Sequence, residues 1–136
     1  MVQEVIHDPL LLAQKSEPAT EKDCRIITDL ADTLKANRDR CVGMAANMIG
    51  ERKCIIVFCN GPIIMAMVNP QITKKSGEYT AEEGCLSLAG TRKAKRWQEI
   101  TVSYLDESFR PHVNTFHGYT AQIIQHECDH CEGILI

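Results

Sequence analysis

The chain has 136 residues, of which 44% are hydrophobic and 24% charged, and its formal net charge is −3. This length suits one domain with a single core, so we expect residues 1–136 to form one domain. No segment approaches the roughly 20 apolar residues that span a bilayer, and the N-terminus lacks the basic start of a signal peptide. The basic run at 91–96 is typical of a solvated face. We therefore expect a cytoplasmic protein with no membrane and no direct nucleic acid among its partners.

Seven cysteines occur along the chain. An odd number without a secretory signal argues against a disulfide framework and favours a reducing compartment. Most of these thiols are expected to be buried as small hydrophobic groups. One or two could serve as metal ligands.

The first elements follow from local signals. The segment around Val5–Leu12 is expected to be extended. Thr20–Asp23 has the pattern of a capping box, and apolar residues at helical spacing behind it predict a helix to about Asn37. A turn rich in glycine and alanine follows at Gly43–Ala46.

Strands dominate the middle of the chain, and a second helix ends it. The β-rich runs lie at 54–59, 63–69 and 99–106, with a polar stretch through 71–80 and a further strand at 110–116, broken near Pro111. Residues 119–131 are predicted to be helical, with Ile123 and Ile124 inward and Gly133 as the end. The order of elements predicts an α+β fold with a largely antiparallel sheet.

The late helix carries the motif H-E-x-x-H at residues 126–130. His126 and His130 are four residues apart, so on a helix both imidazoles can reach one cation. Glu127 lies beside that position and can take a proton from water. A chance match on a solvated helix is the alternative, but the surrounding residues fit an inward helix. Catalytic sites of this type use three protein ligands, so the third must come from elsewhere.

Three cysteines are candidates for the third ligand. Cys128 lies roughly 200° around the helix from the histidines, and Cys131 about 100° from His130. A closed site of two cysteines and two histidines on this helix is therefore geometrically poor. Cys85 follows Gly84, which would let the backbone turn sharply and bring the thiolate close to a ligand. Spacing alone leaves Cys85 open between a ligand and a buried thiol.

Three segments together resemble the peptide deformylase family. The family patterns are G-x-G-x-A-A-x-Q, E-G-C-L-S and Q-H-E-x-D-H, and this chain has CVGMAANM at 41–48, EGCLS at 83–87 and QHECDH at 125–130. Ile6–Pro9 is similar to the opening strand of the family. The resemblance implies a single-domain α+β fold in which a mostly antiparallel sheet surrounds a C-terminal metal-binding helix, with the N-terminal helix packed outside.

The resemblance also implies an activity. Cys85, His126 and His130 would ligate one divalent metal ion, with Fe²⁺ expected and Zn²⁺, Ni²⁺ or Co²⁺ as substitutes. Glu127 would act as general base and then acid, and the backbone N–H of Leu86 would hold the developing oxyanion. The implied reaction is hydrolysis of the N-formyl group of N-formylmethionyl peptides or nascent chains, with transient proximity to the ribosome.

Substrate contacts are implied for a larger set of residues. An apolar pocket would take the methionine side chain, Glu83 would anchor the site, Gln125 would line it, and Arg92 would contact the substrate backbone. The implied substrate-binding residues are Val42, Gly43, Met48, Glu83, Gly84, Arg92, Ile124 and Gln125.

The first motif departs from the family pattern. Met48 stands where the family has the glutamine whose amide supports the oxyanion, and Cys41 replaces the first glycine. Loss of one oxyanion donor lowers kcat by ~10²–10³ in hydrolases. We therefore expect a deformylase with reduced activity. The alternatives are a weak or inactive metal-containing paralogue that binds formyl-peptides or another ligand, and an H-E-x-x-H endopeptidase, which the cysteine ligand argues against.

Overall fold

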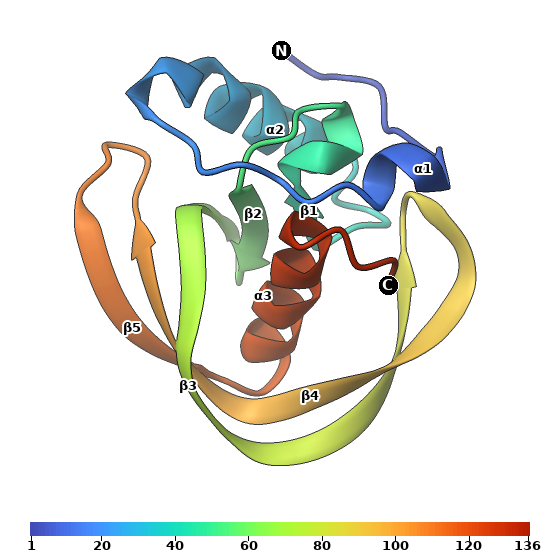
Figure 1. The fold of residues 1–136 in the computed structure, drawn as a ribbon, viewed down its shortest axis with the longest axis vertical. Coiled ribbons are helices and arrows are strands. Elements are labelled where there is room, and N and C mark those ends of the chain that lie inside the picture. The colour runs from blue at the N-terminus through green and yellow to red at the C-terminus, as the bar shows by residue number, and fades with distance from the viewer.

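The computed structural model describes all residues 1–136 and contains one five-stranded antiparallel sheet (Figure 1). The α-helices are α1 (Pro9–Leu12), α2 (Cys24–Ala36) and α3 (Gly118–Cys131), and two short 3₁₀ helices are η1 (Glu21–Asp23) and η2 (Ala46–Ile49). The strands are β1 (Gly43–Ala45), β2 (Ile55–Asn60), β3 (Ile63–Cys85), β4 (Leu88–Leu105) and β5 (Pro111–His117). None of the helices is long and apolar enough to cross a membrane.

Each strand pairs antiparallel with the next one in the chain, so the spatial order is β1-β2-β3-β4-β5. The β3–β4 hairpin is the longest element, pairing from Val68 with Leu105 to Cys85 with Leu88. Three register irregularities interrupt this ladder, and such irregularities bend and twist a strand. The hairpin accordingly curves around α3, which lies in the hollow of the sheet (Figure 1).

Strand β2 is buried on both faces. Ile55 and Val57 belong to a hydrophobic cluster with α2, whereas Ile56 and Phe58 belong to a second cluster with α3. Successive side chains of a strand point to opposite faces, so the two helices cover opposite sides of the sheet here. The expected arrangement is confirmed: a mostly antiparallel sheet surrounds the C-terminal helix, and the N-terminal helix packs outside.

The local signals for the helix ends are also confirmed. Thr20 and Asp23 form a reciprocal capping box in front of α2. Behind α3, Gly133 has a φ of 75°, and the Ile134 N–H donates to the Asp129 carbonyl at 3.0 Å. A glycine in the left-handed conformation is a standard helix end. A Cβ at Gly133 would also lie 2.5 Å from the Ala13 carbonyl oxygen, so the position has no room for a side chain.

The expectation of an extended segment up to Leu12 is wrong, because Pro9–Leu12 form α1. The Asp8 side chain accepts a hydrogen bond from the Leu10 N–H, and proline occupies the first turn. Both features start a helix, and one short turn has too few residues to show a hydrophobic period.

Two further expectations about the sheet need correction. The polar stretch through 71–80 is the middle of β3, which continues to Cys85. Gly84 therefore lies within a strand and its φ is not positive, so it does not produce a sharp turn. Strand β5 is not broken at Pro111 but begins there, at an edge of the sheet where a missing N–H removes no interior ladder bond.

A substitution at Ile124 tests how much the packing of α3 against the sheet contributes to stability. Its side chain is fully buried in the α3 cluster, so Ile124→Ala is expected to lower the free energy of unfolding by about 2–5 kcal/mol. Ile63→Ala is the matched control, because Ile63 is 63% exposed, and it should change stability by less than about 1 kcal/mol. Urea denaturation measures both values, and equal losses would contradict the assigned core.

Candidate active site

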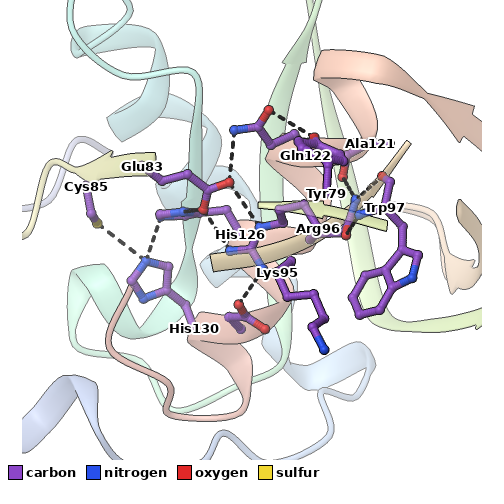
Figure 2. Close-up of polar contacts among 12 residues, drawn as sticks. Tyr79, Glu83, Cys85, Lys95, Arg96, Trp97, Ala121, Gln122, His126 and His130 are labelled. Atoms are coloured by element: carbon purple, nitrogen blue, oxygen red, sulfur yellow. Dashed lines mark hydrogen bonds and ion pairs between the residues drawn. The ribbon is translucent and has the colours of Figure 1, made fainter. Parts of the chain in front are cut away.

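Three ligand atoms from two elements meet at one point. Cys85 is the last residue of β3, and His126 and His130 lie on α3. The Cys85 sulfur lies 3.4 Å from Nε2 of His130, which lies 3.2 Å from Nε2 of His126. All three ligand atoms lie within 4.8 Å of one another (Figure 2). A thiolate and two imidazoles form a donor set that suits several transition-metal ions.

One of the histidines is held by a buried carboxylate. Glu83 Oε1 lies 2.9 Å from Nδ1 of His126, which leaves Nε2 of that ring facing His130. A carboxylate behind a metal-binding imidazole fixes its orientation and raises its basicity. Arg96 donates to both oxygens of Glu83, at 2.7 and 3.0 Å, and to Asp129 at 2.8 Å. The arginine thus joins β3, β4 and α3 beside the ligands (Figure 2).

Both carboxylate oxygens of Glu83 accept hydrogen bonds. Gln122 donates to its Oε2 at 2.9 Å, and Tyr79 donates to the Gln122 side chain at 3.2 Å. Burial raises the pKa of Glu83, but the hydrogen bonds from His126 and Arg96 outweigh burial and lower that pKa to about 2. The negative charge is therefore permanent at neutral pH.

The two imidazoles differ in protonation. Burial and the charge of the neighbouring His126 lower the pKa of His130 to about 3, so its ring is neutral. Burial also lowers the pKa of His126, but the Cys85 thiol and the Glu83 carboxylate outweigh it and raise that pKa to about 10. A cation that binds here must displace protons from the ligand atoms.

Glu127 has the opposite environment to Glu83. Its side chain is buried, and its Oε1 has no hydrogen-bond partner within the protein. Burial raises its pKa to about 7. Such a carboxyl group can both accept and return a proton near neutral pH. Gly43 makes room for it, because a Cβ there would lie 2.9 Å from Oε2 of Glu127 and 2.8 Å from the Ile123 side chain.

Cys85, His126 and Glu127 line an open cleft of about 710 Å³, whereas His130 is fully buried. One wall is the segment leading into β1, and the other is the end of the β3–β4 hairpin. The predicted residues on this cleft are Val42, Gly43, Glu83, Gly84, Cys85, Leu86, His126 and Glu127. The N–H of Leu86, in the turn between β3 and β4, donates to no other group of the protein.

Four predicted substrate-binding residues do not line the cleft. Ile124 is fully buried in the core, and the Gln125 amide is bonded to the backbone of Trp97. Met48 is 1% exposed, and the Arg92 guanidinium turns to the Ala89 carbonyl at 3.5 Å. Gln125 thus fastens α3 to β4, and Ile124 packs beneath it. Neither side chain lines the cleft.

The other candidate ligands also lie elsewhere. Cys128 and Cys131 pack against the hydrophobic cluster of α3, as their angular positions predict. Asn47, next to Met48, donates to the His130 carbonyl at 3.0 Å. The Asn47 amide is therefore bonded to the end of α3 and does not take the place of the glutamine amide that the family has at position 48.

Arg96 is the functional residue that the sequence analysis missed. It belongs to the basic run that was interpreted as a solvated face, yet it is only 4% exposed. The alternation in β4 holds the signal, because Lys93 and Lys95 are exposed and point to the opposite face from Arg96. A charged residue on the inward face of a strand needs a buried partner, which here is Glu83.

The fold and the ligand geometry define a metal-dependent hydrolase of the H-E-x-x-H type. The model of the polypeptide deformylase family matches residues 3–136. The chain is 54% identical over 136 residues to a peptide deformylase of Clostridium beijerinckii, covering 100% of both chains. It is 37% identical to the enzyme of Caldanaerobacter subterraneus, covering 96% of this chain and 82% of the relative.

Solved structures agree with these relatives. The structure of peptide deformylase from Thermotoga maritima has a TM-score of 0.88 and 28% identity, covering 99% of this chain and 95% of the other. A class I type b deformylase from Acinetobacter baumannii, solved with Met-Ala-Ser bound, has a TM-score of 0.89 and 26% identity, covering 99% and 97%. The chain belongs to the polypeptide deformylase family.

A substitution at Glu83 tests whether the carboxylate behind His126 strengthens metal binding. Glu83→Gln keeps the shape of the side chain but removes the charge behind His126, so metal affinity is expected to fall by about 10–100-fold. Glu82→Gln is the matched control, since Glu82 is exposed and bonds only to Thr91. Competition with a chelating dye measures both affinities. An unchanged affinity in Glu83→Gln would contradict the role of this carboxylate.

Proposed function

We propose that the protein removes the N-formyl group from N-formylmethionyl peptides by metal-dependent hydrolysis, releasing formate and a free amine. The observation that carries this proposal is the meeting of the Cys85, His126 and His130 ligand atoms beside the buried, unpartnered carboxylate of Glu127. An H-E-x-x-H site with a cysteine ligand matches the family to which the chain belongs.

The donor set fits one divalent ion, held by Cys85 Sγ and the Nε2 atoms of His126 and His130. Fe²⁺ is the expected ion, and Zn²⁺, Ni²⁺ and Co²⁺ are substitutes, because a thiolate with two imidazoles accepts each of them. When bound, such an ion supplies Lewis-acid polarisation of the formyl oxygen and activation of water. The Glu83 carboxylate keeps the His126 ring in place for this ion.

Glu127 carries the protons of the reaction. Its Oε1 accepts a proton from the attacking water and returns it to the leaving amine, which its pKa of about 7 allows. The unpaired N–H of Leu86 lies in the cleft wall beside Cys85 and donates to the oxygen that gains charge. A formyl carbon bears only hydrogen, so a close-fitting site here excludes larger acyl groups.

The open edge of β1 is where we place the peptide backbone. Strand β1 ends the sheet, and Val42 and Gly43 line the cleft. A peptide that adds to a free strand edge gains main-chain hydrogen bonds. Its N-terminal formyl group then lies toward Gly43 and the carboxyl group of Glu127, whose Oε2 would be 2.9 Å from a Cβ at Gly43.

The substrate class also suggests a cellular setting. Formylmethionine stands at the start of nascent chains, so we place the protein in the cytoplasm with transient proximity to the ribosome. Two of its relatives are peptide deformylases of bacteria. Cosedimentation with translating and with empty ribosomes tests this setting, and equal absence from both fractions would contradict it.

Formate release tests the activity. Protein loaded anaerobically with Fe²⁺ or Ni²⁺ is expected to release formate from formyl-Met-Ala-Ser, and Glu127→Gln should lower kcat by about 10²–10⁴-fold. Both proteins should hold equal metal, because Glu127 is not a ligand. A chelator should abolish release, and re-addition of the ion should restore it. Formate release no higher than in Glu127→Gln would disprove the proposal.

Met48 is expected to limit the rate. Its thioether accepts the Ala45 N–H at 3.5 Å and offers no donor. A glutamine at this position would accept the same N–H and retain two donors, so Met48→Gln is expected to raise kcat, by up to ~10²-fold. Steady-state kinetics on metal-matched samples measure the change. An unchanged kcat would show that the missing amide does not limit turnover.

A further inference from the structure

On the free edge of β1, two backbone groups that point away from β2 form hydrogen bonds with sulfur atoms. The Cys59 N–H of β2 donates to the Val42 carbonyl at 2.8 Å, so the backbone carbonyl of Val42 faces β2. Bonded and non-bonded pairs alternate along an antiparallel ladder. Gly43 and Ala45 therefore point their N–H and C=O groups away from β2, toward the edge that no strand covers.

Two side chains meet these outward groups. The Cys41 thiol donates to the Gly43 carbonyl at 3.0 Å, and the Met48 thioether accepts the Ala45 N–H. Cys41 and Met48 are the two positions at which the first motif departs from the family pattern. The two departures therefore act on the same short strand.

The two contacts differ in their access to the cleft. Met48 is 1% exposed and lies in the core, whereas Cys41 is half-buried and lines the cleft together with Gly43. Burial raises the pKa of the Cys41 thiol to about 12, so the sulfur keeps the proton that it donates. Glu127, whose free carboxylate oxygen marks the reacting end of the cleft, adjoins the same glycine.

We propose that Cys41 sets the peptide affinity of this site: its thiol donates to the Gly43 carbonyl and competes for that carbonyl with the N–H of a peptide that bonds to the edge of β1. A thiol is a weak donor, so a peptide N–H can replace it by rotation of one side chain. The competition lowers the affinity for every peptide that uses this carbonyl. The inference rests on the proposed function for the identity of the peptide.

A series at position 41 tests the displacement. Cys41→Ala removes the donor and is expected to lower the Kd of the product peptide Met-Ala-Ser by about two- to fivefold. Cys41→Ser supplies a stronger donor of similar shape and should raise that Kd by a similar factor, about two- to fivefold. Calorimetry on the metal-loaded protein measures Kd without turnover. The KM for formyl-Met-Ala-Ser should follow the same order.

Cys59→Ala is the matched control, because Cys59 is a half-buried thiol on the adjacent strand and does not line the cleft. Its Kd should equal that of the unsubstituted protein. Equal Kd values for cysteine, alanine and serine at position 41, or weaker binding in Cys41→Ala, would overturn the inference. Absence of formate release would instead contradict the proposed function, while the order of Kd values would still report on the thiol.

Discussion

The buried ion pair between Glu83 and Arg96 is the constraint on which the rest of the site depends. Both side chains are almost fully buried, and removing one partner of such a pair typically costs about 3–5 kcal/mol. Glu83 also holds His126, and Arg96 also holds Asp129. These contacts hold the end of the hairpin against α3, where the Cys85 sulfur lies beside His130.

The two buried carboxyl groups beside Cys85, His126 and His130 differ in pKa because their surroundings differ. Glu83 has donors on both oxygens and remains an anion, whereas Glu127 has an oxygen without any partner and a pKa of about 7. Environments that push two carboxyl pKa values apart separate a structural role from a proton-transfer role. The absence of a side chain at Gly43 preserves this difference, because a Cβ there would displace Glu127.

Predictions from the sequence succeeded where the signal is local. The helix bearing His126 and His130 follows from its apolar spacing and from Gly133, and the exclusion of Cys128 follows from helical angle alone. They failed where pairing is distant in sequence. The polar middle of β3 is a strand because β4 pairs with it, and Arg96 is buried because α3 covers it. The polar middle of β3 leaves no periodic pattern in its own segment, and the alternation in β4 does not by itself show which face α3 covers.

The sequence by itself determined the chemistry: the H-E-x-x-H helix, a requirement for one further ligand, and the family resemblance that points to Cys85. These depend on residue identity and on spacing within one element, which the chain fixes before it folds. Only the tertiary structure decided which side chains face the cleft. It placed Ile124 and Gln125 in the packing of α3 and set the Cys41 thiol on the Gly43 carbonyl. The direction of a side chain depends on strand register and on what packs against it, and both are set by contacts between distant segments.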